Sequence, residues 1–293
     1  MAAMRQGRLT IAGADGAANR EIAYTDWGDA SNPDILVCTH GLTRNSRDFD
    51  VLARAMADTY RVVCPDAAGR GESGWLPTPE AYGYPRYVAD TQALLAHLGA
   101  AQVDWVGTSM GGLLGMLAAT LPDAPIRRLV INDIGPFIPK ESLQRIDGYL
   151  ALAPGRQFAD LDAAEAYLRD AHAPFGPLTD ADWRHLAEHS TRPAEDGRLR
   201  LHFDPAIAAG FHAAIGDDVD LWAVWDQVPC PVLVLHGVSS DVLPAGIARA
   251  MTERGPRTTV MDIAECGHAP ALMADDQIAL VRRWLAEAPV ETS

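Results

Sequence analysis

Short, nearly continuous apolar runs alternate along the chain with longer segments in which apolar residues recur at helical spacing. The runs have the length of strands and cover residues 34–40, 60–66, 103–109, 126–135, 229–237 and 257–268. Helical spacing is found over residues 46–58, 86–98, 113–121, 245–253 and 276–288. Strands that are apolar on both faces and separated by helices indicate an α/β fold with a mostly parallel sheet covered on both sides.

The first part of the chain departs from this alternation. Two strand-like runs, 8–13 and 20–28, flank a turn-rich ADGAAN segment and predict an antiparallel hairpin.

The alternation also stops between Gly135 and about Ile215. This region contains several helix-like stretches separated by segments rich in glycine and proline, with no convincing buried strand. We therefore expect a core built from residues 1–134 and 216–293, with an inserted all-α cap over residues 135–215.

Composition limits the class of protein. Hydrophobic residues make up 48% of the 293 residues, which is enough for a large core and argues against disorder. The formal net charge is −15, from 39 acidic and 24 basic residues, and no cluster of lysine and arginine relieves it. Such a surface repels phosphate backbones, so we expect no nucleic-acid partner.

The apolar runs and the cysteines bear on location. No run approaches the length of a membrane span, and the N-terminal segment lacks the apolar centre of a signal peptide. The four cysteines include no CxxC pair, and three of them lie in or beside strand-like runs. We expect a cytoplasmic protein that does not insert into membranes and whose cysteines are reduced and mostly buried.

One segment, Gly107-Thr108-Ser109-Met110-Gly111, fits the pattern G-x-S-x-G at the junction of a predicted strand and helix. A serine hydroxyl is a weak nucleophile and must project toward both a base and a carbonyl. A very tight strand-to-helix turn exposes it, but side chains at the flanking positions would clash, so glycine is needed on both sides. The following helix directs its N-terminal amides toward a developing oxyanion.

Three further motifs accompany this turn. HGLT at 40–43 begins with the last residue of the run 34–40, DAAGRGES covers 66–73, and CGH at 266–268 closes the last run, 257–268. Together with G-x-S-x-G, they make nearly the full chain resemble an α/β-hydrolase with an α-helical cap. The resemblance implies Ser109 as nucleophile, His268 as general base, and the amides of Leu42 and Met110 as the oxyanion hole.

The acid of the triad has two main candidates. Asp241 follows the run 229–237, where most of the family carries its acid, and is the preferred one. Asp133 ends the run 126–135, where some members carry theirs, although it could instead bind backbone amides. Asp262 lies within the last strand and is a poorer candidate. Either of the first two could orient the imidazole and stabilise its charged form.

The resemblance implies acyl transfer on a small carboxylic ester, with no cofactor and no metal. The alternatives are a cofactor-free C–C bond hydrolase of dienoate type, for which Arg44 could bind the carboxylate, or a lactonase. A ligand-sensing receptor on the same scaffold belongs to a different functional class. His185 and His189 have metal-ligand spacing, but the sequence indicates no third ligand, which favours a polar helix face.

The cap is expected to determine the substrate. Its apolar residues could line an acyl or alcohol pocket or could hold the cap to the core, and they include Phe137, Ile138, Phe175, Trp183 and Phe211. We predict a moderately apolar pocket for short-to-medium acyl esters, including oligomeric polyesters. The oligomeric state is left open.

Overall fold

The computed structural model describes residues 3–12 and 19–287. Its centre is an eight-stranded sheet with the order β1-β2-β4-β3-β5-β6-β12-β13. All neighbouring strands from β4 to β13 run parallel, whereas β1 and β2 form an antiparallel hairpin and β2 pairs antiparallel with β4. The strands are β1 (Arg5–Ile11), β2 (Arg20–Trp27), β3 (Ile35–Thr39), β4 (Arg61–Pro65), β5 (Val103–Thr108), β6 (Ile126–Asn132), β12 (Val232–Gly237) and β13 (Thr258–Ile263).

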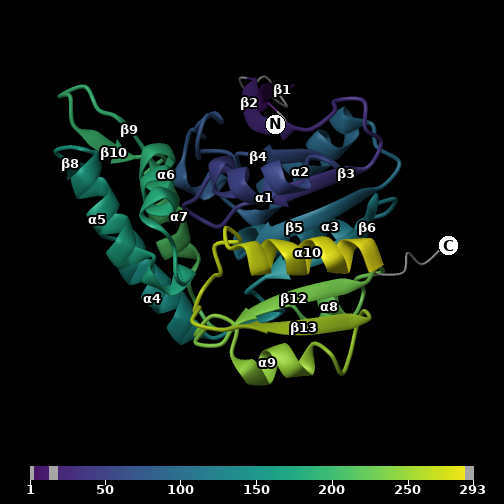
Figure 1. The fold of residues 1–293 in the computed structure, drawn as a ribbon. Coiled ribbons are helices and arrows are strands. Elements are labelled where there is room, and N and C mark those ends of the chain that lie inside the picture. The colour runs from purple at the N-terminus through teal and green to yellow at the C-terminus, as the bar shows by residue number, and fades with distance from the viewer. Residues whose placement is uncertain (1–2, 13–18, 288–293) are drawn as a thin grey trace.

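Helices cover both faces of the sheet, as the apolar runs predict (Figure 1). On one face lie α1 (Asp50–Met56) and α10 (Asp275–Glu287), and on the other lie α2 (Tyr84–Leu98), α3 (Met110–Ala119) and α8 (Trp222–Trp225). Helix α9 (Ala245–Ala250) follows β12.

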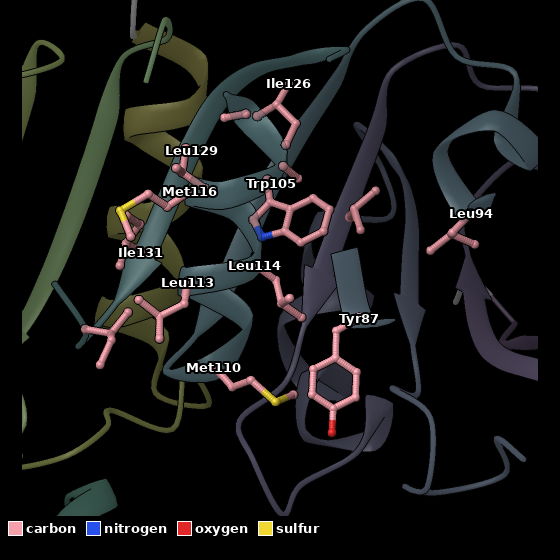
Figure 2. Packing of buried hydrophobic residues seen from close by; sticks show 14 of the residues in the cluster. Tyr87, Leu94, Trp105, Met110, Leu113, Leu114, Met116, Ile126, Leu129 and Ile131 are labelled. Carbon is pink, nitrogen blue, oxygen red and sulfur yellow. The ribbon is translucent and has the colours of Figure 1, made fainter. Parts of the chain in front are cut away.

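Successive residues of each central strand point into the hydrophobic clusters on opposite faces of the sheet. Because both faces are buried, these strands are apolar throughout. In β5, Trp105 belongs to the cluster on the α3 side, whereas Val106 belongs to the cluster under α1 and α10. Figure 2 shows the indole of Trp105 among side chains of α3 and β6. Its Nε1 donates to the Gly111 carbonyl at 3.1 Å, so this packing also ties β5 to the beginning of α3.

The segment between β6 and β12, for which we expect a cap and which is called the cap below, stands at one end of the sheet (Figure 1). Its helices are α4 (Lys140–Leu150), α5 (Leu161–Ala171), α6 (Asp180–Ser190) and α7 (Ala206–Ala214), with the short 3-10 helix η3 (Ala173–Phe175). It also contains a three-stranded antiparallel sheet, β8 (Gln157–Phe158), β10 (Leu199–Leu201) and β9 (Thr191–Pro193). Strand β7 (Phe137–Ile138) pairs with β11 (Val219–Asp220).

The expectation of an all-α cap is therefore wrong. The cap strands are two or three residues long, and some of their positions are arginine or proline, so no alternating pattern can be recognised in them. All four cysteines are buried and none forms a disulfide, as expected. Among the described helices, none combines the length and apolar character needed to cross a bilayer.

Candidate active site

Ser109 occupies a strained turn between β5 and α3. Its φ is 51° and its ψ is −116°, a region that residues with a Cβ rarely adopt. A Cβ on Gly107 would lie 2.2 Å from the Gly111 carbonyl oxygen, and a Cβ on Gly111 would lie 2.1 Å from the Thr39 carbonyl oxygen. The two glycines of G-x-S-x-G are thus required by close backbone contacts, as the sequence predicts.

His268 joins Ser109 to Asp133. The imidazole Nε2 lies 2.9 Å from Ser109 Oγ, and Nδ1 lies 2.8 Å from Asp133 Oδ2. Asp133 is fully buried and also accepts from the Gly237 amide at 2.7 Å and from Ser240 Oγ at 2.6 Å. With Nδ1–H donating to this carboxylate, Nε2 carries a lone pair that can accept the serine proton.

The structure contradicts the preference for Asp241. This carboxylate pairs with Arg145 of α4, its side chain is 48% exposed, and its backbone carbonyl accepts from Ser142 Oγ. Asp241 thus holds the cap to the loop after β12, while Asp133 contacts His268. Both aspartates follow adjacent parallel strands, so the sequence places both at the same sheet edge but does not show which one faces the histidine. Asp262 pairs with His236 and does not contact His268.

Arg70 contacts both residues whose amides we expect to form the oxyanion hole, through the Leu42 carbonyl and the Met110 sulfur. It is fully buried, and its Nε donates to the Leu42 carbonyl at 2.8 Å. Its Nη1 donates to the Ala68 carbonyl and the Tyr87 hydroxyl, and its Nη2 lies 3.8 Å from Met110 Sδ. The Met110 amide is the first in α3 and has no intrahelical acceptor. Arg70 comes from DAAGRGES, and its role in holding this turn was not recognised from the sequence.

His40 also stabilises the HGLT turn after β3. Its Nδ1 lies 2.7 Å from the Gly41 carbonyl, and its Nε2 accepts from the Ala67 amide at 2.9 Å, which requires the neutral imidazole protonated at Nδ1. Burial lowers the pKa of His40 to about 4. A neutral, doubly bonded His40 therefore links the turn after β3 to the loop after β4.

The buried histidines predict an acid-sensitive fold. Between pH about 4 and 6.5 unfolded His40 binds a proton that folded His40 does not, so the free energy of unfolding should rise with pH, by up to about 3 kcal/mol from this group. Burial also lowers the pKa values of His172, His189 and His202, with the same sign. Burial raises the pKa of Asp66 to about 6, which acts in the opposite direction, but the histidines outnumber it.

Urea unfolding of wild type at several pH values between about 4.5 and 7.5 would measure this slope. In His40→Gln the free energy of unfolding should rise less steeply with pH than in wild type, whatever the overall stability of the variant. His212, whose side chain is 76% exposed, supplies the matched control His212→Gln, which should keep the wild-type slope. An identical slope in wild type and His40→Gln would contradict the prediction.

A cavity of about 350 Å³ opens above Ser109, between the core and the cap. Its lining is mainly apolar and includes Met110, Leu113, Ile134, Leu143, Ile146 and Val242. Of the predicted cap residues, Ile138, Phe175 and Phe211 line it. Phe137 and Trp183 do not. Phe137 lies in the β7–β11 pairing, and Trp183 packs between α5 and α6 against Met273.

One wall of this cavity carries charge. Arg44 is buried, forms two hydrogen bonds to Asp48 at 2.8 and 2.7 Å, and directs Nη1 toward His172 Nε2 at 3.4 Å. Phe175 stacks on the His172 ring at a centroid distance of 4.6 Å. The sequence indicated Arg44 from its position after HGLT, but His172, which lies 128 residues later, carries no sequence signal.

Among the described residues, one group of side chains has the ligand types of a metal site: Asp50, His185 and His189. The sequence indicates no third ligand beside His185 and His189, and in the fold Asp50 lies close enough to be one. Its carboxylate, however, accepts hydrogen bonds from the guanidinium of Arg47, whose Nη1 also lies 3.3 Å from His189 Nδ1. A cation would have to displace Arg47, so this cluster is better explained as the polar contact between α6 and the core.

Comparison with known proteins agrees with this fold. A model of the alpha/beta hydrolase family matches residues 36–281. A 3-hydroxybutyrate-oligomer hydrolase from Cupriavidus necator is 41% identical over 276 residues, which are 92% of this chain and 94% of that protein. A 2-hydroxymuconate semialdehyde hydrolase from Pseudomonas putida is 29% identical over 79% of each chain.

A solved structure shows the same likeness. An α/β hydrolase from Novosphingobium aromaticivorans superposes with a TM-score of 0.84 at 36% identity, covering 96% of this chain and 98% of that one. With the family model matching most of the chain, and with relatives above 30% identity over nearly their whole length, the protein belongs to the alpha/beta hydrolase family, a family of hydrolytic enzymes.

Proposed function

We propose that this protein is a serine ester hydrolase acting on short oligomers of 3-hydroxybutyrate or closely similar hydroxyacid esters. The observation that carries the proposal is the chain of hydrogen bonds from Ser109 Oγ through His268 to Asp133, at the floor of a mainly apolar cavity. We assign Ser109 as nucleophile, His268 as general base and acid, and Asp133 as the residue that orients the imidazole.

The reaction follows from this geometry in two steps. Ser109 Oγ attacks the ester carbonyl while its proton passes to His268 Nε2, and the amides of Leu42 and Met110 stabilise the oxyanion. The C–O bond to the leaving alcohol then breaks, and His268 returns the proton to that oxygen. Water attacks the acyl-serine with His268 again accepting a proton, and the carboxylic acid leaves as Ser109 is restored.

The shape and polarity of the cavity support an oligomeric hydroxyacid ester. A volume of about 350 Å³ suits a small ligand, and the mainly apolar lining suits the methyl-bearing backbone of such an oligomer. The free carboxylate at one end of the oligomer needs a cation. Arg44 lines the cavity, and its Nη1 is the guanidinium nitrogen that Asp48 does not bind. The Cupriavidus necator relative, a 3-hydroxybutyrate-oligomer hydrolase, supports the same substrate class.

The proposal is tested by incubating the enzyme with the trimer of 3-hydroxybutyrate and measuring released dimer and monomer by chromatography. We expect steady turnover. The competing C–C hydrolase is tested in parallel by the loss of absorbance of 2-hydroxymuconate semialdehyde. Higher kcat/KM on this dienoate than on the trimer would overturn the ester assignment in favour of C–C cleavage, and binding without turnover would favour a receptor.

The role of Arg44 is tested in the same assay with the trimer as free acid and as methyl ester. The double variant Arg44→Gln with Asp48→Asn removes the ion pair without leaving an unpaired carboxylate. It should raise KM for the free acid by roughly tenfold, the value of one charge-assisted hydrogen bond, and leave the methyl ester unaffected. Arg145→Gln is the matched control, because Arg145 also lines the cavity but pairs with Asp241. Equal effects on both substrates would exclude carboxylate binding by Arg44.

A further inference from the structure

A second and larger cleft, of about 790 Å³, shares no lining residue with the cavity above Ser109. It is bordered by the β1–β2 hairpin, the loop after β4, and the cap strands β9 and β10. Its walls carry four arginines, Arg8, Arg47, Arg192 and Arg200, against three acidic residues, Asp66, Glu72 and Glu188. Arg8 pairs with Glu21 and Arg47 pairs with Asp50, which leaves Arg192 and Arg200 as the two arginines of this wall to be explained.

Two of these arginines are held in an unfavourable arrangement. Arg192 of β9 and Arg200 of β10 are direct cross-strand partners, and like charges placed opposite each other destabilise an antiparallel pair. Arg192 Nε is buried and, in the part of the chain that the structure describes, has no hydrogen-bond acceptor. Burial and the charge of Arg200 both lower the pKa of Arg192. The described fold offsets this cost only in part, through Trp75 and through Asp204 and Glu72 at longer range.

Two of the three acidic side chains of the cleft have other partners. Glu72 lies 3.8 Å from Arg8 and 3.6 Å from His202, with its side chain 56% exposed. Asp66 is buried, and its two oxygens accept from the amides of Ser46 and Glu72. Within residues 3–12 and 19–287, Arg192 and Arg200 therefore form no ion pair with a carboxylate, although Asp204 and Glu72 act on Arg192 at longer range.

An exposed indole lies beside these two cations. Trp75 is 42% exposed, which is unusual for tryptophan, and it lines the same cleft. The guanidinium carbon of Arg192 lies 4.3 Å from the centre of its ring, and that of Arg200 lies 6.0 Å away. These cation–π contacts place the indole next to the two guanidinium groups. The cleft therefore presents the apolar surface of Trp75 beside the hydrogen-bond donors of Arg192 and Arg200.

We propose that this cleft binds a small organic anion, whose carboxylate or phosphate group lies between Arg192 and Arg200 and whose apolar part contacts Trp75. An anion placed there would accept hydrogen bonds from the two guanidinium groups and neutralise the repulsion between the two arginines. The site is separate from the cavity above Ser109, and ester hydrolysis does not require it.

The experiment titrates the full-length enzyme carrying Arg44→Gln with Asp48→Asn, which removes the proposed carboxylate contact above Ser109. The ligands are 3-hydroxybutyrate, acetate and inorganic phosphate, and binding is followed by isothermal calorimetry together with tryptophan fluorescence. We expect saturable binding of at least one of them, weakened by salt, and its identity distinguishes a carboxylate from a phosphate ligand. In Arg192→Gln with Arg200→Gln the affinity should fall by roughly tenfold or more, and in Trp75→Phe the fluorescence response should disappear.

Arg254→Gln is the matched control, because Arg254 also lies over an indole, that of Trp222 at 4.9 Å, but is paired with Asp226. It should bind the anions as wild type does. Ester turnover should stay unchanged in the double arginine variant, which separates this proposal from the assignment of the serine site. Binding that persists in the double arginine variant, or no saturable binding of any of the three anions, would overturn the proposal.

Discussion

Replacing Asp133 by asparagine is expected to lower kcat for ester hydrolysis by roughly four orders of magnitude, the effect of the same change in a serine protease triad. An amide at this position can present its NH2 group to His268 Nδ1, which would favour the wrong imidazole tautomer. Asp241→Asn is the matched comparison, because it removes only a half-exposed ion pair with Arg145. We expect it to change kcat less than about threefold and stability by less than about 1 kcal/mol.

The measurement is kcat on p-nitrophenyl butyrate for wild type, Asp133→Asn and Asp241→Asn, with circular dichroism and Tm for each. Asp133 also accepts from Gly237 and Ser240, so some loss of stability in its variant is expected, and kcat should be compared at a temperature where the variant is folded. A large loss in Asp241→Asn with near-normal activity in Asp133→Asn would reverse the assignment.

Ser109→Ala is expected to lower kcat for p-nitrophenyl butyrate about a millionfold. Loss of the catalytic serine has an effect of this size in a serine protease. The backbone at Ser109 keeps its positive φ in the variant, and Gly107 and Gly111 still permit the tight turn, so the fold should be retained. Labelling by a fluorophosphonate, followed by mass spectrometry, should give one adduct on wild type and none on the variant.

Ser142→Ala is the control for Ser109→Ala. Ser142 is buried and its Oγ donates to the Asp241 carbonyl, so its loss affects the cap contact and not the serine turn. This variant should react with the fluorophosphonate and hydrolyse the ester as wild type does. Undiminished turnover by purified Ser109→Ala would exclude Ser109 as the nucleophile.

The choice between Asp133 and Asp241 illustrates what the sequence could not resolve. Strands β6 and β12 are neighbours, so both aspartates are expected at one edge of the sheet. Which carboxylate reaches His268 depends on the conformation of two loops. Asp133, with φ at 57°, stays within the site, whereas Asp241 faces the cap and meets Arg145. No local pattern encodes that difference.

The cap shows the same limit. Helical spacing predicts α4, α5 and α6 but not α7, and β8, β9 and β10 are too short to produce a recognisable period. The hydrophobicity of Trp183 does not distinguish packing between helices from lining a cavity. Ile138, Phe175 and Phe211 line the cavity, whereas Phe137 does not. All four are apolar residues of the cap, and the sequence alone does not distinguish them.

The parallel sheet, the helices on both of its faces and the turn around Ser109 could be predicted from the chain because their requirements are local. A strand buried on both faces must be apolar throughout, and a serine at positive φ between two close backbone contacts must be flanked by glycines. The partner of His268, the Arg44–His172 wall and the opposed Arg192 and Arg200 join residues through strand pairing and cap docking. Those contacts depend on long-range packing, so only the tertiary structure reveals them.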